Sequence, residues 1–158
     1  MKKTTAYYWF MALLIAQANV FAASVNNKII YRLERTEYSG FTLPEYAKSS
    51  QCIIYNNGNI VIKNSASILT TTSRDKVQIE GDLQDLIVKA AEGKFTTNPY
   101  PVDASTITYI AYPDKFPPTV KLAPIALFEQ NGGTGQEIIN ENAAATVLRN
   151  FIDLHCSN

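Results

Sequence analysis

The residue stretch 51–63, QCIIYNNGNIVIK, indicates the fold more clearly than any other part of the chain. Two apolar, β-branched runs at residues 51–55 and 60–63 flank the polar segment Asn56-Asn57-Gly58-Asn59. Asn57-Gly58 favours the positive φ angles of a tight hairpin turn. The sequence therefore predicts an antiparallel β-hairpin, with Cys52 on its first strand.

Further strands are predicted on both sides of this hairpin. Residues 28–37 (KIIYRLERTE) alternate between apolar and polar side chains, which is the period of a half-buried strand. After the hairpin, residues 68–72 and 76–80 favour two short strands, separated by the polar residues 73–75. We expect these segments to extend one sheet.

Two amphipathic helices are predicted in the second half of the chain. Asp82 is typical of a helix N-cap, and the apolar residues of 82–92 recur at helical spacing before Gly93. Asn140 or Asn142 can cap a final helix that runs to Leu154. The residues expected on the buried faces are Leu83, Leu86, Ile87 and Ala90 in the first helix, and Ala144, Leu148, Phe151 and Ile152 in the second.

The segment between the two helices favours strands and turns. Residues 98–101 (NPYP) predict an extended turn, and residues 105–112 and 119–128 predict strands, with Pro124 placing the second at an edge or a bulge. Residues 131–135 (NGGTG) predict a flexible loop. Together these elements predict an α+β fold, an antiparallel sheet with about two helices packed on one face.

The first residues have the pattern of a cleavable signal peptide. Lys2 and Lys3 precede an apolar run at residues 6–16 that is too short to span a bilayer comfortably. Small residues then favour cleavage after Ala22, with cleavage after Ala23 or an uncleaved anchor as alternatives. We therefore expect residues 1–22 to be removed and residues 23–158 to form a single secreted domain, periplasmic or extracellular, without a stable membrane anchor.

The charge of the mature chain limits the classes of partner. The 158-residue precursor has balanced charges, and loss of the two lysines leaves 12 basic residues against 14 acidic ones, with no basic run. Nucleic acid and anionic membranes are therefore not expected partners.

Two cysteines, Cys52 and Cys156, are the only ones in the chain. In an oxidising compartment, an even pair far apart in sequence predicts one structural disulfide. Two free thiols or a redox pair is the alternative, although the C-x-x-C spacing of redox pairs is absent.

The sequence offers few residues for catalysis. His155 is the only histidine and follows the expected final helix closely, where a cation complements the helix dipole. One histidine and a cysteine pair do not suffice for zinc, and residues 132–135 lack the lysine of a phosphate-binding loop. Four acidic residues are candidates for the carboxylate pair of glycoside chemistry, but acidic residues at strand ends are usually solvated surface: Glu34, Glu37, Glu45 and Asp103. We expect no catalytic site, metal or cofactor.

Aromatic residues concentrate in segments where packing does not demand them. Tyr38, Phe41, Leu43 and Tyr46 lie in one predicted loop, and further aromatic residues lie in two others. Aromatic side chains with Gly and Pro are typical of contact surfaces, and a satellite core beneath a long loop is the alternative. The aromatic residues in the other two predicted loops are Tyr100, Tyr112 and Phe116. The residues predicted to bind a partner are Tyr38, Ser39, Gly40, Phe41 and Tyr46.

Residues 34–41 (ERTEYSGF) resemble the E-R-x-G-G-F entry of the emfourin-type inhibitors of thermolysin-like metalloproteases. The order that follows is also similar: a Leu-rich helix at 83–91, a Pro-flanked strand with D-x-x-x-x-x-Y at 103–109, another strand and a closing helix. The chain differs in the Cys52 hairpin and in Ser39, where the family has a glycine. The resemblance implies protease inhibition, with residues 39–41 in contact with the protease.

These observations favour an exported, non-enzymatic binding module for a protein partner, in its most specific version an inhibitor of a secreted protease acting through residues 38–46. A periplasmic immunity protein against a toxin, or an envelope-assembly protein with a dedicated partner, is the alternative. A small hydrolase using His155 with Asp153 or with a strand carboxylate is a third hypothesis.

Overall fold

The computed structural model describes residues 31–66, 69–113 and 123–157, so the predicted signal peptide lies outside the described residues. The described part contains eight strands, a short 3-10 helix (η1) and two α-helices. In chain order they are β1 (Arg32–Tyr38), η1 (Pro44–Tyr46), β2 (Lys48–Tyr55), β3 (Asn59–Ala66), β4 (Leu69–Lys76), α2 (Leu83–Ala90), β5 (Phe95–Pro99), β6 (Thr106–Tyr112), β7 (Ile125–Asn131), β8 (Gln136–Asn140) and α3 (Ala143–Cys156).

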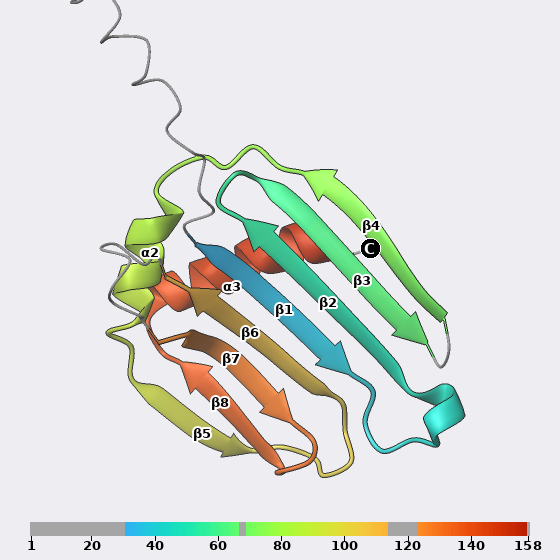
Figure 1. The fold of residues 1–158 in the computed structure, drawn as a ribbon. Helices are drawn as coiled ribbons and strands as arrows, with labels where there is room; N and C mark the ends of the chain where they lie inside the picture. The colour runs from blue at the N-terminus through green and yellow to red at the C-terminus, as the bar shows by residue number, and fades with distance from the viewer. Residues whose placement is uncertain (1–30, 67–68, 114–122, 158) are drawn as a thin grey trace, which may run out of the picture.

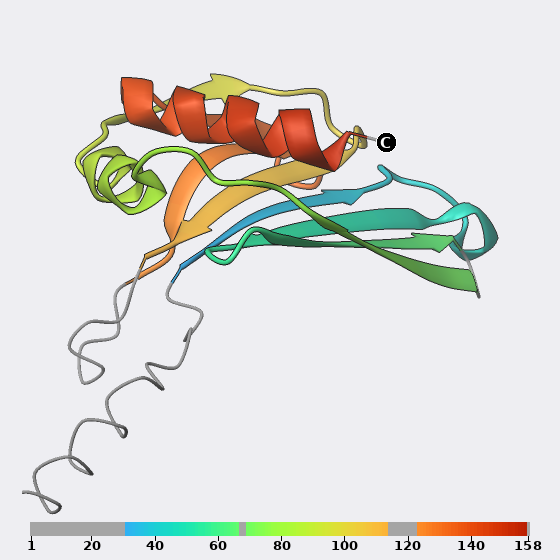
Figure 2. The same ribbon diagram turned by 90° about the horizontal axis from the view of Figure 1, so that it is seen from above.

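The eight strands form one antiparallel sheet in the order β4-β3-β2-β1-β6-β7-β8-β5 (Figure 1). The first four strands form a meander, and β6 returns to pair with β1 in the middle of the sheet. Both helices lie on the same face of the sheet, and no described element covers the other face (Figure 2). The predicted α+β class, with two helices on one face, is confirmed. We call the two sides the helix face and the open face.

The hairpin of β2 and β3 is confirmed, with one difference in its turn. Gly58 has a φ of 81°, whereas Asn57 does not adopt a positive φ. The amide of Gly58 donates to the carbonyl of Tyr55 (2.8 Å), and the amide of Asn59 donates to Oδ1 of Asn57 (3.0 Å). The loop is thus longer than the two-residue turn that Asn57-Gly58 suggested, and only its glycine needs a left-handed backbone.

Residues 69–80 were divided wrongly by the sequence pattern. A single strand, β4, runs through the polar residues 73–75 that were expected to separate two strands, and residues 77–80 form no strand. Every residue of β4 is exposed, so the strand lacks the apolar alternation that sequence patterns detect. Its backbone is held instead by an unbroken ladder to β3, from Asn59 opposite Lys76 to Ala66 opposite Leu69.

Two short strands were not predicted. Residues 98–99 belong to β5 rather than to a turn, and residues 136–140 form β8. The strand expected at 119–128 begins only at Ile125, so Pro124 precedes it, and its bulge lies opposite Tyr109 and Ile110. The rest of that prediction, residues 119–122, lies outside the described residues.

The helix α2 begins at its predicted cap, and α3 begins at Asn142, one of the two candidates. Oδ1 of Asp82 accepts a hydrogen bond from the amide of Asp85 (3.1 Å), and Oδ1 of Asn142 accepts one from the amide of Ala144 (2.9 Å). The helices pack on each other and on the central strands. The buried core comprises Leu33, Cys52, Ile54, Ile60, Ile62, Leu83, Ile87, Ala90, Tyr109, Ala111, Leu127, Phe128, Ala144, Ala145, Leu148, Ile152 and Cys156.

The predicted disulfide joins Cys52 on β2 to Cys156 at the end of α3, with Cα atoms 5.8 Å apart. Both cysteines are buried. The bridge closes a loop of 104 residues and fixes the end of the last helix to the first half of the sheet. In the chain-entropy model, a loop of this length stabilises the fold by up to about 4–5 kcal/mol.

Candidate binding surface

Residues 38–46, which we call the contact loop, join β1 to β2 at one end of the sheet. Four of its large apolar side chains are exposed: Tyr38 (54%), Phe41 (88%), Leu43 (60%) and Tyr46 (65%). They do not form the buried satellite core that was the alternative reading of this segment. An aromatic side chain as exposed as Phe41 contributes almost no apolar burial to the stability of the fold and is typical of a contact surface.

The backbone of the contact loop is held at several points. The amide of Ser39 donates to the carbonyl of Lys48 (2.8 Å), and the amide of Lys48 donates to Oγ of Ser39 (2.9 Å), which closes the base of the loop. The amide of Phe41 donates to the carbonyl of Asp103 (3.1 Å) in a neighbouring loop. A Cβ atom at Gly40 would overlap the backbone of Asp103 and Ala104, so only glycine permits this approach.

The loop at 100–105 is hydrogen-bonded to the contact loop, and the loop at 131–135 is hydrogen-bonded to the loop at 100–105. The amide of Asp103 donates to the carbonyl of Gly132 (3.0 Å), and Asp103 itself has a positive φ of 66°. Oδ1 of Asn131 accepts from the amides of Gly133 and Thr134 (3.0 and 3.1 Å). Residues 131–135 are therefore a hydrogen-bonded hairpin turn rather than the flexible loop that their glycines suggested.

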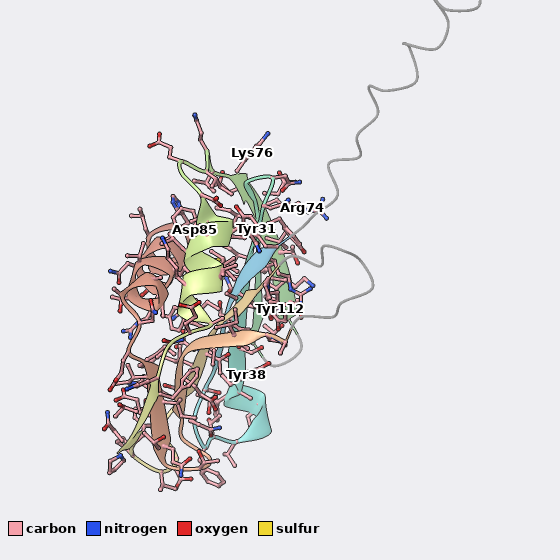
Figure 3. The ribbon with its side chains drawn as sticks, turned by 90° about the vertical axis from the view of Figure 1, so that its left-hand side faces the viewer. Tyr31, Tyr38, Arg74, Lys76, Asp85 and Tyr112 are labelled. Carbon is pink, nitrogen blue, oxygen red and sulfur yellow. A yellow bond between two sulfur atoms is a disulfide. The ribbon has the colours of Figure 1, made fainter. Side chains whose placement is uncertain are left out.

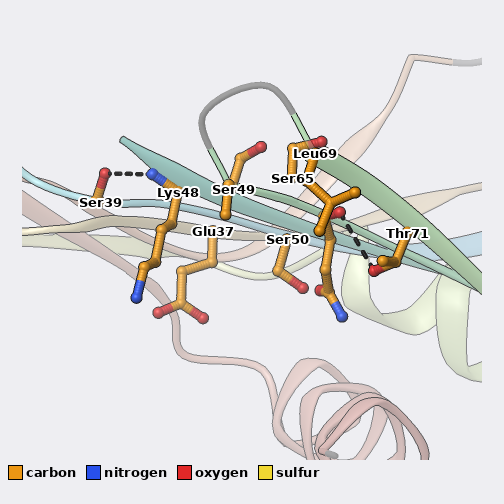
Figure 4. A pocket seen from close by; sticks show the side chains of 10 residues that line it. Glu37, Ser39, Lys48, Ser49, Ser50, Ser65, Leu69 and Thr71 are labelled. Atoms are coloured by element: carbon orange, nitrogen blue, oxygen red, sulfur yellow. Dashed lines mark hydrogen bonds between the residues drawn. The ribbon is translucent and has the colours of Figure 1, made fainter. Parts of the chain in front are cut away.

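Beside the base of the contact loop, the helix face of the sheet is hollowed into a groove of about 480 Å³ (Figure 4). Polar side chains on four neighbouring strands line it in one row, because the register places Glu37, Ser50, Asn64 and Thr71 opposite one another. The other lining residues are Ser39, Lys48, Ser49, Ser65, Ala66 and Leu69. The groove thus connects the contact loop to the edge strand β4.

A polar cluster lies between this groove and α3. Nε of Arg35 donates to the hydroxyl of Tyr109 (3.1 Å), which donates to Oδ1 of Asp153 (2.6 Å). Arg35 also pairs with Glu37 (2.7 Å) and lies 3.8 Å from Asp153. The guanidinium of Arg149 lies over the ring of Tyr109. The cluster fixes the strand that leads into the contact loop.

Burial raises the pKa of the Tyr109 hydroxyl, and its hydrogen bond to Asp153 raises it further. Burial alone lowers the pKa of Arg35, but Tyr109 and Glu37 outweigh that effect and raise it overall. At neutral pH Tyr109 is therefore a neutral donor and Arg35 a cation, which suits a structural cluster rather than an acid and base pair.

On the open face, Glu34 is almost fully buried among polar and aromatic neighbours. Gln51 donates to Oε1 of Glu34 (2.7 Å), Arg32 lies 3.6 Å from Oε2, and the guanidinium of Arg32 stacks on Tyr112 (4.0 Å). Tyr112 lies opposite Arg32 at the start of β1, whereas Tyr38 is the last residue of that strand; both tyrosines are labelled in Figure 3. Tyr112 is thus half-buried in the sheet and does not join the contact loop.

The residues considered for catalysis do not meet. The ring of His155 makes an edge-to-face contact with Phe151 (4.7 Å between ring centroids), and no described carboxylate bonds to it. Asp153 accepts a hydrogen bond from Tyr109. Glu34 and Glu37 lie on opposite faces of the sheet. Glu45 and Asp103 lie in separate exposed loops.

Neither a metal site nor a membrane-spanning helix is found in the described part. No group of three or more His, Cys, Asp or Glu residues there is arranged to hold a metal ion. None of its helices has the length and apolar character needed to cross a bilayer.

The structure places the five predicted binding residues in one loop, but it also adds neighbours that the sequence did not reveal. Val102 is 68% exposed on the supporting loop. Phe116, predicted to lie in a third aromatic loop, is outside the described residues, and Tyr100 is only partly exposed. Residue types and spacing gave no signal that residues 103 and 132 support the contact loop, because those contacts are made by backbone atoms.

No protein-family model matches the chain, and no curated protein shows significant similarity to it.

Proposed function

We propose that this protein is an exported, non-enzymatic binding module whose contact loop recognises a protein partner, in its most specific version a secreted protease that the loop inhibits. The observation that carries the proposal is the pairing of a highly exposed Phe41 with a backbone held by neighbouring loops. A loop that is ordered before binding loses less conformational entropy when it binds, which favours affinity.

The chemistry of the loop also supports a protein partner. Four side chains of the loop present apolar area, namely Tyr38, Phe41, Leu43 and Tyr46. The polar residues Ser39 and Lys48 at the base of the loop line the adjoining groove. An apolar centre with a polar rim is the usual composition of protein interfaces. The disulfide is compatible with export, since disulfides persist in oxidising compartments.

The inhibitor version is tested with the purified mature protein and a panel of secreted proteases that includes a thermolysin-like metalloprotease. We expect one protease of the panel to be inhibited, and Phe41→Ala to weaken inhibition by about 2 kcal/mol or more, as at interface hot spots. Phe95→Ala is the matched control, because Phe95 is a half-exposed phenylalanine (52%) on the far edge of the sheet.

Two outcomes would change the proposal. Inhibition that is equally weakened by Phe41→Ala and Phe95→Ala would remove the contact loop as the site. Absence of inhibition, together with tight binding to one dedicated partner that depends on Phe41, would replace the inhibitor version with the immunity or envelope-assembly version.

A further inference from the structure

The two edges of the sheet are protected very differently. The β5 edge is only five residues long and ends in Pro99, which has no amide hydrogen to offer a neighbouring strand. The β4 edge is eight residues long, contains neither proline nor a bulge, and is exposed throughout. Its charged residues, which are another means of blocking an edge, are confined to its last three positions, Arg74, Asp75 and Lys76. Edge strands of this kind are templates for pairing with another strand, and proteins normally block them.

No described residue pairs with the outer side of β4, which is the last strand in the sheet order. Its first five residues, LTTTS, carry no charge and are mostly β-branched. These side chains favour extended backbone and pack well against a neighbouring strand. The outer backbone groups of Leu69 to Ser73 are therefore available for strand addition.

Charge on the open face specifies the kind of strand that fits. Arg74 and Lys76 point to the same side of β4, because side chains alternate along a strand. Lys63 lies opposite Thr72 on β3 and so joins them on that face. Figure 3 shows Arg74 and Lys76 at one corner of the sheet. None of the three cations forms an ion pair with another described residue.

A second copy of the chain offers no matching charge. Two β4 strands related by a two-fold axis would run antiparallel, so pairing centred on residues 69–73 would place Arg74 and Lys76 of the two copies at opposite ends of the shared ladder. The β4 strand carries no acidic side chain on that face, because Asp75 points to the other one. An acidic strand supplies the missing carboxylates and gains attraction to both cations.

We propose that β4 binds an extended strand of the protein partner by β-strand addition, and that this strand carries two acidic residues separated by one residue, facing Arg74 and Lys76. This inference rests on the proposed function and gives the partner a second point of attachment. The groove connects the two sites, because Ser39 at the contact loop and Leu69 on β4 both line it.

The test selects peptides from a random ten-residue display library on the mature protein and on an Arg74→Glu/Lys76→Glu variant. The wild type is expected to enrich peptides with an acidic-x-acidic pattern, and the variant to enrich a basic-x-basic pattern. An enriched acidic peptide should bind the variant at least about tenfold more weakly. The same peptides on both proteins, or no charge pattern on either, would overturn the proposal.

Two further measurements locate the peptide. Hydrogen exchange of the β4 amides is expected to slow when the peptide binds. Thr71→Pro and Thr72→Pro are made in parallel, because amides of successive residues point alternately toward β3 and outward. The proline whose amide hydrogen pointed outward leaves the ladder to β3 complete, so this variant should stay folded and lose peptide binding. Retained binding in this variant would overturn strand addition.

Selection on the Phe41→Ala variant separates this inference from the proposed function. An unchanged acidic-x-acidic pattern on that variant shows that β4 binds the peptide without Phe41. Peptide binding by β4 would then stand even if the contact loop recognises no partner. A dimer in sedimentation that disappears in the proline variants would assign the edge to a second copy and overturn the inference.

Discussion

At the scale of single residues, the shape of the contact loop depends on Gly40. Its Cα lies so close to the backbone of Asp103 and Ala104 that any side chain must push the two loops apart. Gly133 is an exposed glycine in the neighbouring turn, where an added Cβ would meet only the Asn131 side chain at 3.3 Å. The two positions therefore form a matched pair.

We expect Gly40→Ala to weaken partner binding about tenfold or more and to cost about 1–3 kcal/mol of stability, as overpacking does. Gly133→Ala should leave binding unchanged. Binding is measured by calorimetry and stability by urea unfolding. Equal effects of the two substitutions would show that the approach of Gly40 to Asp103 does not shape the loop.

Tyr109 is the second residue whose chemistry can be isolated. Tyr109→Phe keeps the buried ring but removes the hydroxyl shared by Arg35 and Asp153. We expect a loss of about 0.5–1.5 kcal/mol in the free energy of unfolding at neutral pH. Urea unfolding of both proteins checks this value, and an unchanged midpoint would mean that the hydroxyl does not stabilise the fold.

The same variant changes the dependence of stability on pH. The pKa of Tyr109 is raised in the folded state, so its contribution is complete below pH 10 and is lost as pH rises through the folded pKa. The wild type should lose stability above about pH 10, and Tyr109→Phe should lose less. Tyr31 keeps part of the dependence, because its pKa is also raised by burial. Identical slopes would contradict this assignment.

Some single-residue features are predictable because their causes are local. Asp82 was identified as a cap from its residue type and from the apolar pattern that follows, and Asn142 was one of two candidates for the second cap. The positive φ expected at Asn57 was wrong, because the turn places only Gly58 in the left-handed region. The Arg35–Tyr109–Asp153 cluster had no sequence signal, since its members are separated by 44 and 74 residues.

At the scale of elements, the disulfide and α3 determine how the first half of the sheet is held to the second. Cys156 ties the last turn of α3 to β2, and Asp153 binds Tyr109 on β6 one turn earlier. Leu148 and Ile152 of the same helix are fully buried. Loss of the disulfide should thus loosen the end of α3 more than its start.

Reduction of the Cys52–Cys156 disulfide is expected to lower the free energy of unfolding by about 2–5 kcal/mol. Urea unfolding with and without reductant measures the change, and a Cys52→Ala/Cys156→Ala variant, which should not respond to reductant, is the control. A midpoint that reductant leaves unchanged in the wild type would show that the bridge does not stabilise the native fold.

Elements with a buried apolar face were predicted and polar ones were not. The β2–β3 hairpin and both helices have strong periodicity, so their sequences indicate them directly. β4 is exposed on both faces, and β5 and β8 are five-residue strands. Such strands are held by backbone ladders to their neighbours, and a ladder leaves no pattern in the side chains.

At the scale of the whole molecule, the two proposed binding sites lie next to each other, at one end and one edge of the sheet. The groove joins them, because residues of the contact loop and of β4 both line it. The α+β class followed from the sequence. The support of the contact loop by residues 103 and 132 did not, since it depends on β1 pairing with β6 across the middle of the sheet.

The most direct test of recognition through the contact loop is site-specific photo-crosslinking in the cells that produce the protein. A photo-reactive amino acid is placed at position 41 in the contact loop and, as a control, at position 95 on the far edge. We expect one dominant protein adduct from position 41 and none from position 95. Equal adducts from both positions, or an adduct from position 95 alone, would contradict recognition through the contact loop.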